Sequence, residues 1–194
     1  SFRCLCQWPG EGGAALTYTT AENRVYLGGG GGSGYYNNNV GSTGQRGGGI
    51  VIIRAGSITG NSNSILASGA SNTTSAGADG SGGGGAGGSI LLTATSYTGL
   101  TAIARGGTGG STTNDGLDRC VGPGGGGGGG AIWFSSGSTP AGVTVSQTGG
   151  AAGVTISSAQ GNCTIGGTNN AAAGSNATPA FNLSGTEGNI PLPI

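Results

Sequence analysis

The fold is decided by the stretch Gly124-Gly125-Gly126-Gly127-Gly128-Gly129-Gly130-Ala131-Ile132-Trp133-Phe134, in which seven consecutive glycines lead directly into an apolar run. The same arrangement occurs twice earlier, at Gly47-Gly48-Gly49-Ile50-Val51-Ile52-Ile53 and at Gly87-Gly88-Ser89-Ile90-Leu91-Leu92. The matching glycines lie 39 and then 42 residues apart. Periods of this size are typical of repeat architectures, in which each unit buries its apolar face on its neighbours.

Each unit continues through a polar turn into a second short strand, and we expect these second strands at 64–69, 102–107 and 143–147. Apolar runs such as Ile50–Ile53 carry apolar residues on both faces, which predicts strands buried on both sides. No segment keeps an apolar period of 3.6 residues, so we expect almost no helix.

Glycine-rich stretches separate the strand pairs at 28–34, 72–88, 106–130 and 149–153. Such stretches are either flexible linkers or packed extended backbone of the polyproline II type. Their recurrence directly before each apolar strand favours the packed alternative, because a linker has no reason to keep register with a core strand.

These patterns predict an all-β fold: a repetitive solenoid of short strands, either parallel β-helix-like or layered β/polyproline II, with packed glycine-rich loops. We expect one domain over residues 1–194. It divides into a disulfide-bearing N-terminal segment (1–27), a three-unit repeat core (28–153) and a C-terminal segment with an extended tail (154–194). Further strands are expected at Asn23–Leu27 and Val154–Ser158.

The composition excludes several classes of protein. Glycine makes up 50 of the 194 residues but falls in blocks, and there are only six prolines, so the chain is not collagen. Six Arg balance six acidic residues, which leaves no electrostatic footprint for nucleic acid. No apolar run approaches the roughly 18 residues of a membrane span.

The chain contains no His and no Lys, which removes the Ser-His-Asp triad, the Cys-His dyad and the Schiff-base lysine. Nothing in the sequence brings two of its six acids into one cleft, as a glycosidase would require. We therefore expect no enzyme and no cofactor. The stretch around Asn114, Asp115 and Asp118 has the composition of a weak calcium site, although it lacks the EF-hand spacing and fits an ordinary turn better.

Four cysteines, Cys4, Cys6, Cys120 and Cys163, predict two disulfides and an oxidising compartment. Cys4 and Cys6 are too close to each other to be bonded. The two remaining pairings are Cys4–Cys120 with Cys6–Cys163, and Cys4–Cys163 with Cys6–Cys120. Either one would tie the N-terminus to two distant segments.

Two further groups of residues are candidates for binding. Tyr and Asn side chains are adaptable contact residues, so the recognition surface is expected at a glycine-rich loop with Tyr35, Tyr36, Asn37, Asn38 and Asn39. The tail Asn189–Ile194 is apolar, and its two prolines exclude it from a central strand. Its Ile190, Leu192 and Ile194 are therefore candidates for self-association.

Two stretches carry a resemblance: Asn23-Arg24-Val25-Tyr26-Leu27 with the glycines that follow, and Gly82–Leu92. Their sequence pattern resembles the glycine-rich region of large secreted surface proteins of Bacteroidota. The likeness covers about residues 20–135. Proteins of that kind often carry adhesin-like repeats and a type IX secretion signal. The resemblance implies an exported surface or fibre protein, and it implies no catalytic residues.

The sequence thus predicts an extracellular or cell-surface structural protein, which polymerises into a filament or adhesin fibre or joins neighbouring domains of a longer chain. One alternative is a tip module that binds surface glycans or a receptor through glycine-rich loops, as phage adhesin tips do. The other is an ice-binding protein, which low charge and many Thr allow, although a regular Thr-x-Thr ladder is missing.

Overall fold

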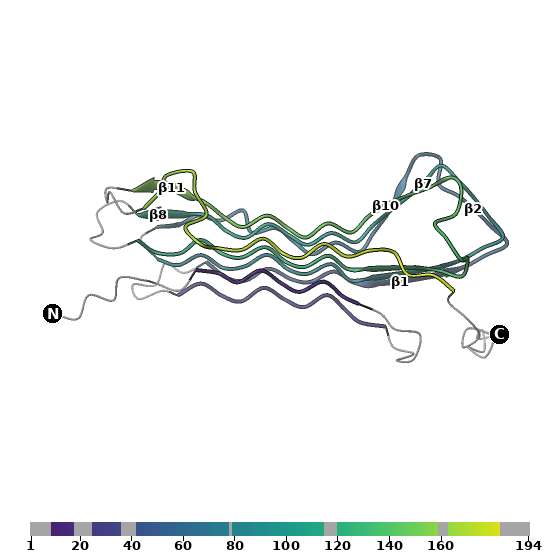
Figure 1. Cartoon of the computed structure of the whole chain (residues 1–194), viewed down its shortest axis with the longest axis horizontal. Helices are drawn as coiled ribbons and strands as arrows, with labels where there is room; N and C mark the ends of the chain where they lie inside the picture. Colours follow the sequence, from purple (N-terminus) through teal and green to yellow (C-terminus); the bar gives the residue numbers. More distant parts are fainter. Residues whose placement is uncertain are drawn as a thin grey trace.

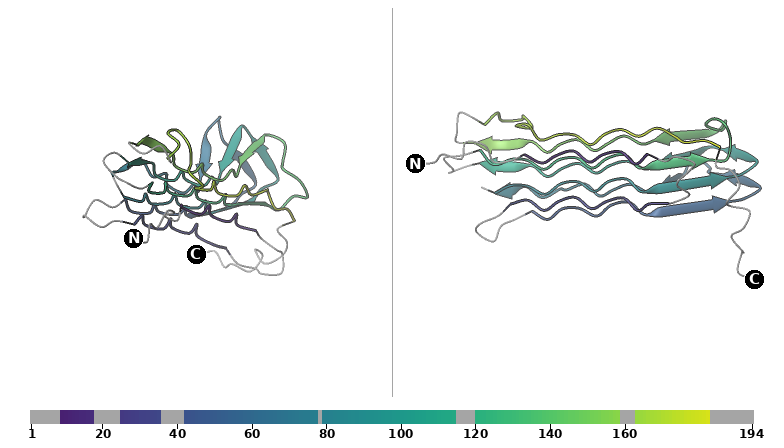
Figure 2. Two further views of the ribbon diagram at one scale, coloured as in Figure 1. Left: turned by 60° about the vertical axis from the view of Figure 1, so that its left-hand side comes forward. Right: turned by 60° about the horizontal axis from the view of Figure 1, so that its bottom comes forward.

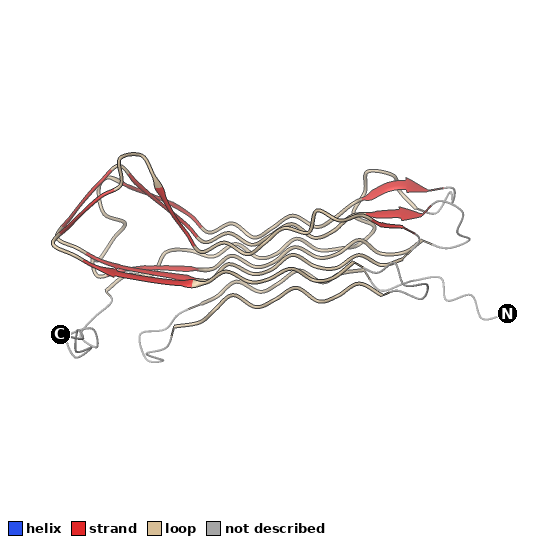
Figure 3. Ribbon diagram, turned by 180° about the vertical axis from the view of Figure 1, so that it is seen from behind, coloured by secondary structure: helices blue, strands red, loops and turns tan. Residues whose placement is uncertain are grey.

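The structure is a computed structural model that describes residues 9–17, 25–35, 42–77, 79–114, 120–158 and 163–182. Within these ranges the chain forms short strands and no helix (Figures 1 and 3). The strands are β1 (Ile50–Arg54), β2 (Ser57–Thr59), β3 (Ser64–Leu66), β4 (Ala76–Gly77), β5 (Ser89–Thr93), β6 (Ser96–Thr98), β7 (Leu100–Ile103), β8 (Thr112–Asn114), β9 (Ala131–Phe134), β10 (Val143–Ser146) and β11 (Thr155–Ser158). The all-β prediction is confirmed.

The strands pair in parallel between successive units of the repeat. Their order is β1-β5-β9 in one sheet, β3-β7-β10 in a second, β4-β8-β11 in a third and β2-β6 in a fourth. Ile50 lies opposite Ser89, which in turn lies opposite Ala131, so the registers reproduce the offsets of 39 and 42 residues in the glycine pattern. The period in the sequence is therefore the period of strand pairing.

The expected strand positions are only partly confirmed. The two strands predicted for each unit occur, and the strand expected at 154–158 is β11. By contrast, the described part of the segment 23–27 forms no strand. The short pairs β2-β6 and β4-β8 were not predicted, because strands of two or three residues carry no readable alternation.

The apolar core lies at one end of the molecule, between the sheets β1-β5-β9 and β3-β7-β10 (Figure 1). Ile90, Leu92, Ile132 and Phe134 are completely buried there. The ring of Phe134 meets Tyr97 edge-on at a centroid distance of 6.2 Å, and Phe181 stacks on it at 6.3 Å. This cluster closes that end of the glycine-rich bundle.

The prediction that apolar runs are buried on both faces is confirmed for β5 and β9 and is wrong for β1. The central strand β5 is buried from Ser89 to Leu92, whereas β1 alternates between exposed and half-buried residues. Ile52 of β1 is 57% exposed. The reason is positional: β1 belongs to the first unit and is the edge strand of its sheet, so a strand covers it on one side only, whereas β5 has a strand on both sides.

The glycine-rich segments run side by side between the two ends as extended, wavy rods (Figures 1 and 2). We number them rod 1 (9–17), rod 2 (27–35), rod 3 (42–49), rod 4 (67–74), rod 5 (79–88), rod 6 (104–111), rod 7 (121–130), rod 8 (147–154) and rod 9 (171–179). Their hydrogen bonds recur every third residue: the N–H groups of Gly10 and Gly13 donate to the carbonyls of Pro123 and Gly126. Three residues is the repeat of polyproline II, which has no internal hydrogen bonds, so each rod bonds to its neighbours.

The hydrogen bonds arrange the rods in three layers. Rods 3, 5, 7 and 9 bond to one another in parallel and form the middle layer, and rods 4, 6 and 8 lie in the grooves on one side. On the opposite side, rod 2 bonds to rods 3 and 5, and rod 1 bonds to rods 7 and 9. The expectation that the glycine stretches are packed is confirmed for the residues that the structure describes.

Close approach of the backbones explains why the middle layer requires glycine. A Cβ on Gly127 in rod 7 would overlap the carbonyl of Gly85 in rod 5. In the same way, a Cβ on Gly84 would overlap the carbonyl of Gly107 in rod 6. Side chains are therefore tolerated only where a rod faces away from its neighbours.

Candidate recognition site at the disulfide end

The end of the bundle opposite the apolar core carries the connections from rod 2 to rod 3, from rod 4 to rod 5, from rod 6 to rod 7 and from rod 8 to rod 9. Gly34 donates to the carbonyl of Ser42 at 2.9 Å, so rods 2 and 3 meet here. The strands β8 and β11 pair with each other at this same end (Figure 1). Parts of the chain that are far apart in the sequence thus meet at one end of a single bundle.

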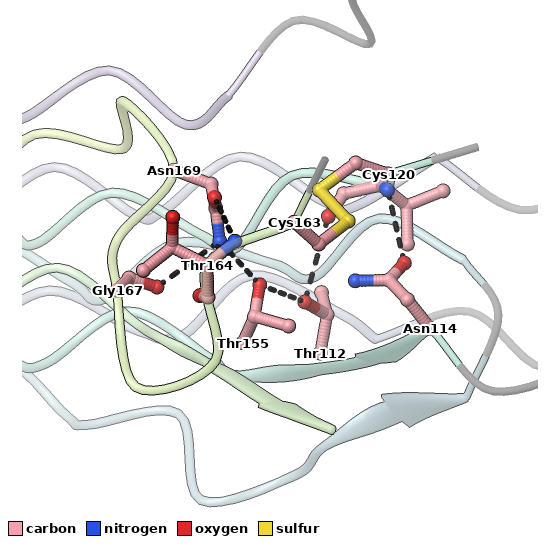
Figure 4. Close-up of a disulfide and its surroundings, with 9 residues drawn as sticks. Thr112, Asn114, Cys120, Thr155, Cys163, Thr164, Gly167 and Asn169 are labelled. Atoms are coloured by element: carbon pink, nitrogen blue, oxygen red, sulfur yellow. Dashed lines mark hydrogen bonds between the residues drawn. A yellow bond between two sulfur atoms is a disulfide. The ribbon is translucent and has the colours of Figure 1, made fainter. Parts of the chain in front are cut away.

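A disulfide between Cys120 and Cys163 fixes this end, with the two Cα atoms 5.5 Å apart (Figure 4). This overturns both predicted pairings, each of which joined these two cysteines to Cys4 and Cys6. The physical reason is the repeat: the two residues are 43 positions apart, and β8 pairs with β11 at offsets of 43 and 44 residues. They occupy equivalent places in successive units, whereas Cys4 and Cys6 lie outside the described residues.

A buried polar cluster lies beneath the disulfide (Figure 4). Thr112 of β8 and Thr155 of β11 are fully buried, and their Oγ1 atoms are 3.5 Å apart. Asn169 donates from Nδ2 to Thr155 Oγ1 at 2.7 Å, and its Oδ1 accepts from the N–H of Thr164 at 3.0 Å. Asn169 has a φ of 46°, in the left-handed region that Asn tolerates better than most residues. The loop after Cys163 is thus held against the third sheet.

The residues predicted to bind calcium are not arranged as a cation site as far as the structure describes them. Asn114 is fully buried, and its Oδ1 accepts from the N–H of Val121 at 2.9 Å, so this oxygen is already used inside the protein. Asp115 and Asp118 lie outside the described residues. Among the residues that are described, no three His, Cys, Asp or Glu side chains lie close enough to hold a metal ion.

Tyr35 is the described member of the predicted recognition surface, and the structure places it at this end. It is the last residue of rod 2, its side chain is 62% exposed, and its carbonyl accepts from the N–H of Gly80 at 2.9 Å. The backbone is thus fixed while the ring is free to contact a ligand. Tyr36, Asn37, Asn38 and Asn39 lie outside the described residues.

Two buried polar residues at this end were missed by the sequence analysis. Asn72 donates from Nδ2 to Ser42 Oγ at 2.8 Å and to the carbonyl of Gly82 at 3.0 Å, and so joins rods 3, 4 and 5. Asp79 is completely buried, and neither carboxylate oxygen has a hydrogen-bond donor among the described residues. The available signal for Asp79 was its place as the single acid at the start of a glycine run.

The predicted self-association residues Ile190, Leu192 and Ile194 lie outside the described residues. The exposed apolar side chains that the structure does show at the core end include Ile50 and Ile52 of β1 and Leu66 of β3. All three belong to the first unit of the repeat, which has no preceding unit beside it.

Comparison with known proteins gives no match to any protein-family model, any curated protein or any solved structure. The described part of the chain contains no helix with the length and hydropathy needed to cross a membrane.

Proposed function

We propose that this protein is a non-enzymatic, extracellular adhesin module whose rod bundle presents a recognition surface at the disulfide end. The observation that carries the proposal is that rod 2, β8 and β11 all end at the disulfide end of the bundle, the end at which Tyr35 is exposed. Binding residues are commonly carried by loops on a rigid scaffold, and here cross-linked rods provide that scaffold.

The chemistry of this end supports an extracellular ligand of low charge. A disulfide persists in an oxidising compartment. Tyr and Asn bind through ring faces and amide groups, which suits the hydroxyl-rich surface of a glycan or the surface of a receptor protein. We further propose that the units form a solenoid-like stack, because parallel registers offset by about one repeat connect them in three sheets.

The change Tyr35→Ala tests the recognition surface. We expect the variant to bind an immobilised array of surface glycans, or whole bacterial cells, about tenfold more weakly than the unchanged protein, because exposed Tyr side chains are frequent binding hot spots. Binding is measured with fluorescently labelled protein over a concentration series. The thermal unfolding midpoint should not move, because the side chain is exposed.

Leu27→Ala is the matched control for this experiment. Leu27 is 66% exposed on the same rod but at the core end. The Leu27→Ala variant should bind the same glycans or cells as tightly as the unchanged protein. Equal losses for the two variants, or no saturable binding by the unchanged protein, would argue against a recognition surface at the disulfide end.

A filament subunit is the second candidate, and one observation favours it. The edge strand β1 exposes Ile50 and Ile52, and an open apolar edge is a template for pairing with another chain. Under this candidate, negative-stain electron microscopy shows uniform fibres, and Ile52→Lys abolishes them by placing a charge on the edge. Discrete particles at all concentrations would leave the adhesin module as the function.

A further inference from the structure

Among the described residues, each of the two central rods, rods 5 and 7, lacks one hydrogen-bonded neighbour, and both lack it at the same place. Rod 5 bonds to rods 2, 3, 4, 6 and 7, and rod 7 bonds to rods 1, 5, 6, 8 and 9. A rod in a hexagonal packing has six neighbours, so each central rod has one direction left. For both rods, this direction lies on the side that carries rods 1 and 2.

In rod 5, the backbone groups that point in the unfilled direction are carbonyls. Its carbonyls at Gly83 and Ala86 accept from rod 3, and those at Gly82 and Gly85 accept from rod 6. Residues three apart in a rod point their carbonyls the same way, and we call such a set a column. The third column of rod 5 contains Gly84 and Gly87. Both residues are buried, and no donor to their carbonyls occurs among the described residues.

In rod 7, the backbone groups that point in the unfilled direction are N–H groups. The N–H groups of Gly124 and Gly127 donate to rod 6, and that of Gly126 donates to rod 9. The remaining column contains Gly125 and Gly128, which are buried and have no acceptor within the described ranges. A buried backbone group without a partner is unfavourable, so these columns favour a chain that would complete them.

The flanking rods continue the same pattern. Rod 2 bonds to its neighbours through the N–H groups of Gly28 and Gly31, and rod 1 bonds through the carbonyls of Gly10 and Gly13. One residue further along, the N–H groups of Gly29 and Gly32 in rod 2 and the carbonyls of Glu11 and Ala14 in rod 1 have no backbone partner among the described residues. We define the unpaired strip as these groups together: the N–H groups of Gly29, Gly32, Gly125 and Gly128 and the carbonyls of Glu11, Ala14, Gly84 and Gly87.

The opposite face shows how the protein satisfies N–H groups that need no further rod. There, Ser71 of rod 4 accepts from the N–H of Thr108 in rod 6 at 3.0 Å, and Ser111 of rod 6 accepts from the N–H of Val154 in rod 8 at 3.2 Å. The unpaired strip has no such hydroxyls. Instead, rod 2 carries Gly29 and Gly32, although a Cβ at either position would meet nothing within 4 Å.

We propose that the unpaired strip binds one extended glycine-rich segment of a second polypeptide, which adds a further rod between rods 1 and 2. The segment would donate to the carbonyls of rods 1 and 5 and accept from the N–H groups of rods 2 and 7. This is the polyproline II counterpart of strand addition at a sheet edge.

Rod 6 shows which sequence the added rod requires, because it also has four rod neighbours. It reads Arg105-Gly106-Gly107-Thr108-Gly109-Gly110-Ser111. A Cβ on Gly106 or Gly107 would overlap a carbonyl of rod 7 or rod 4, whereas the third position carries the half-buried side chain of Thr108. The binding segment is therefore a Gly-Gly-x repeat.

The undescribed termini of this chain do not have this sequence. Residues 1–8 contain no glycine, and residues 183–194 contain Gly185 and Gly188 with larger residues between them. In a second copy of this chain, the Gly-Gly-x runs already form the bundle. A separate glycine-rich polypeptide is therefore the occupant that the spacing favours.

The test uses the ten-residue peptide acetyl-Ser-Gly-Gly-Thr-Gly-Gly-Ser-Gly-Gly-Thr-amide and the whole protein, labelled with ¹⁵N. Saturable shifts are expected in the amide signals of Gly29, Gly32, Gly125 and Gly128. A control peptide with Ala for the second glycine of each pair should bind at least tenfold more weakly. Shifts confined to other amides, or none at millimolar peptide, would overturn the proposal.

A blocking variant tests the position independently. Ala86 belongs to the column of Gly83, whose added Cβ would point between rods 7 and 2, with Gly125 O at 3.3 Å and Gly32 N at 3.6 Å, so the methyl group of Ala86 already points into the strip and the added segment has to pass it. Ala86→Leu should therefore weaken peptide binding at least tenfold, and Ala151→Leu, an exposed position on rod 8, should leave it unchanged. If Ala86→Leu instead abolishes a dimer of the protein alone, the strip binds a second copy and the proposal is wrong.

Discussion

Gly127→Ala is expected to destabilise the protein by about 3 kcal/mol or more, which is a large fraction of the stability of an ordinary domain. Gly127 lies in the middle of rod 7, its N–H donates to Gly107, and its carbonyl accepts from Gly150. An added Cβ would overlap the carbonyl of Gly85. Because the obstacle is hydrogen-bonded backbone, no side-chain rotation can relieve the overlap, and rods 5 and 7 must separate.

The measurement is chemical denaturation followed by circular dichroism, with Gly49→Ala as the matched control. A Cβ on Gly49 would meet nothing within 4 Å, and its φ lies outside the left-handed region. The control should be neutral or stabilised by about 0.4–1 kcal/mol, because Ala restricts the unfolded chain. Similar effects of the two substitutions would show that rod packing is not the reason for the glycines.

Removing the disulfide with the double change Cys120→Ala and Cys163→Ala should lower the free energy of unfolding by about 2–4 kcal/mol. The bond closes a loop of 43 residues, and the chain-entropy relation gives about 4 kcal/mol for a loop of that length. The loss should be largest at the disulfide end, where the bond joins the returns after β8 and β11. Hydrogen exchange of the β4-β8-β11 sheet measures this local effect.

A phosphine reductant provides the control for this variant. The reductant should lower the stability of the unchanged protein by the same amount and should leave the double variant unaltered. A further loss in the double variant would reveal a second disulfide among the remaining cysteines. No loss in either protein would show that the bond does not constrain the unfolded chain.

Most of the repeat was predictable from residue order because the physics of the repeat is local. Glycines recur before each apolar run, and strand pairing follows at the same offsets of 39 and 42 residues. The burial of Trp133 and Phe134 follows from the same pattern. In contrast, β2-β6 and β4-β8 were missed, since strands of two or three residues carry no readable alternation.

The candidate site was less predictable. Tyr35 was identified from its type and its glycine-rich surroundings, and it is exposed at the end of rod 2. The disulfide was assigned wrongly because proximity of Cys4 and Cys6 in sequence was given more weight than the repeat. The separation of 43 residues between Cys120 and Cys163 nearly equals the repeat period, and this was the signal that could have paired them.

The sequence by itself determined an all-β repeat with packed glycine stretches, because period and residue type fix which segments can pair and which can approach closely. The tertiary structure alone decided which glycines are sterically required. Gly127 and Gly29 stand in similar glycine runs, yet a Cβ would overlap backbone at the first and meet nothing at the second. The difference is the number of rods around each residue, and that number depends on how the whole chain folds back on itself.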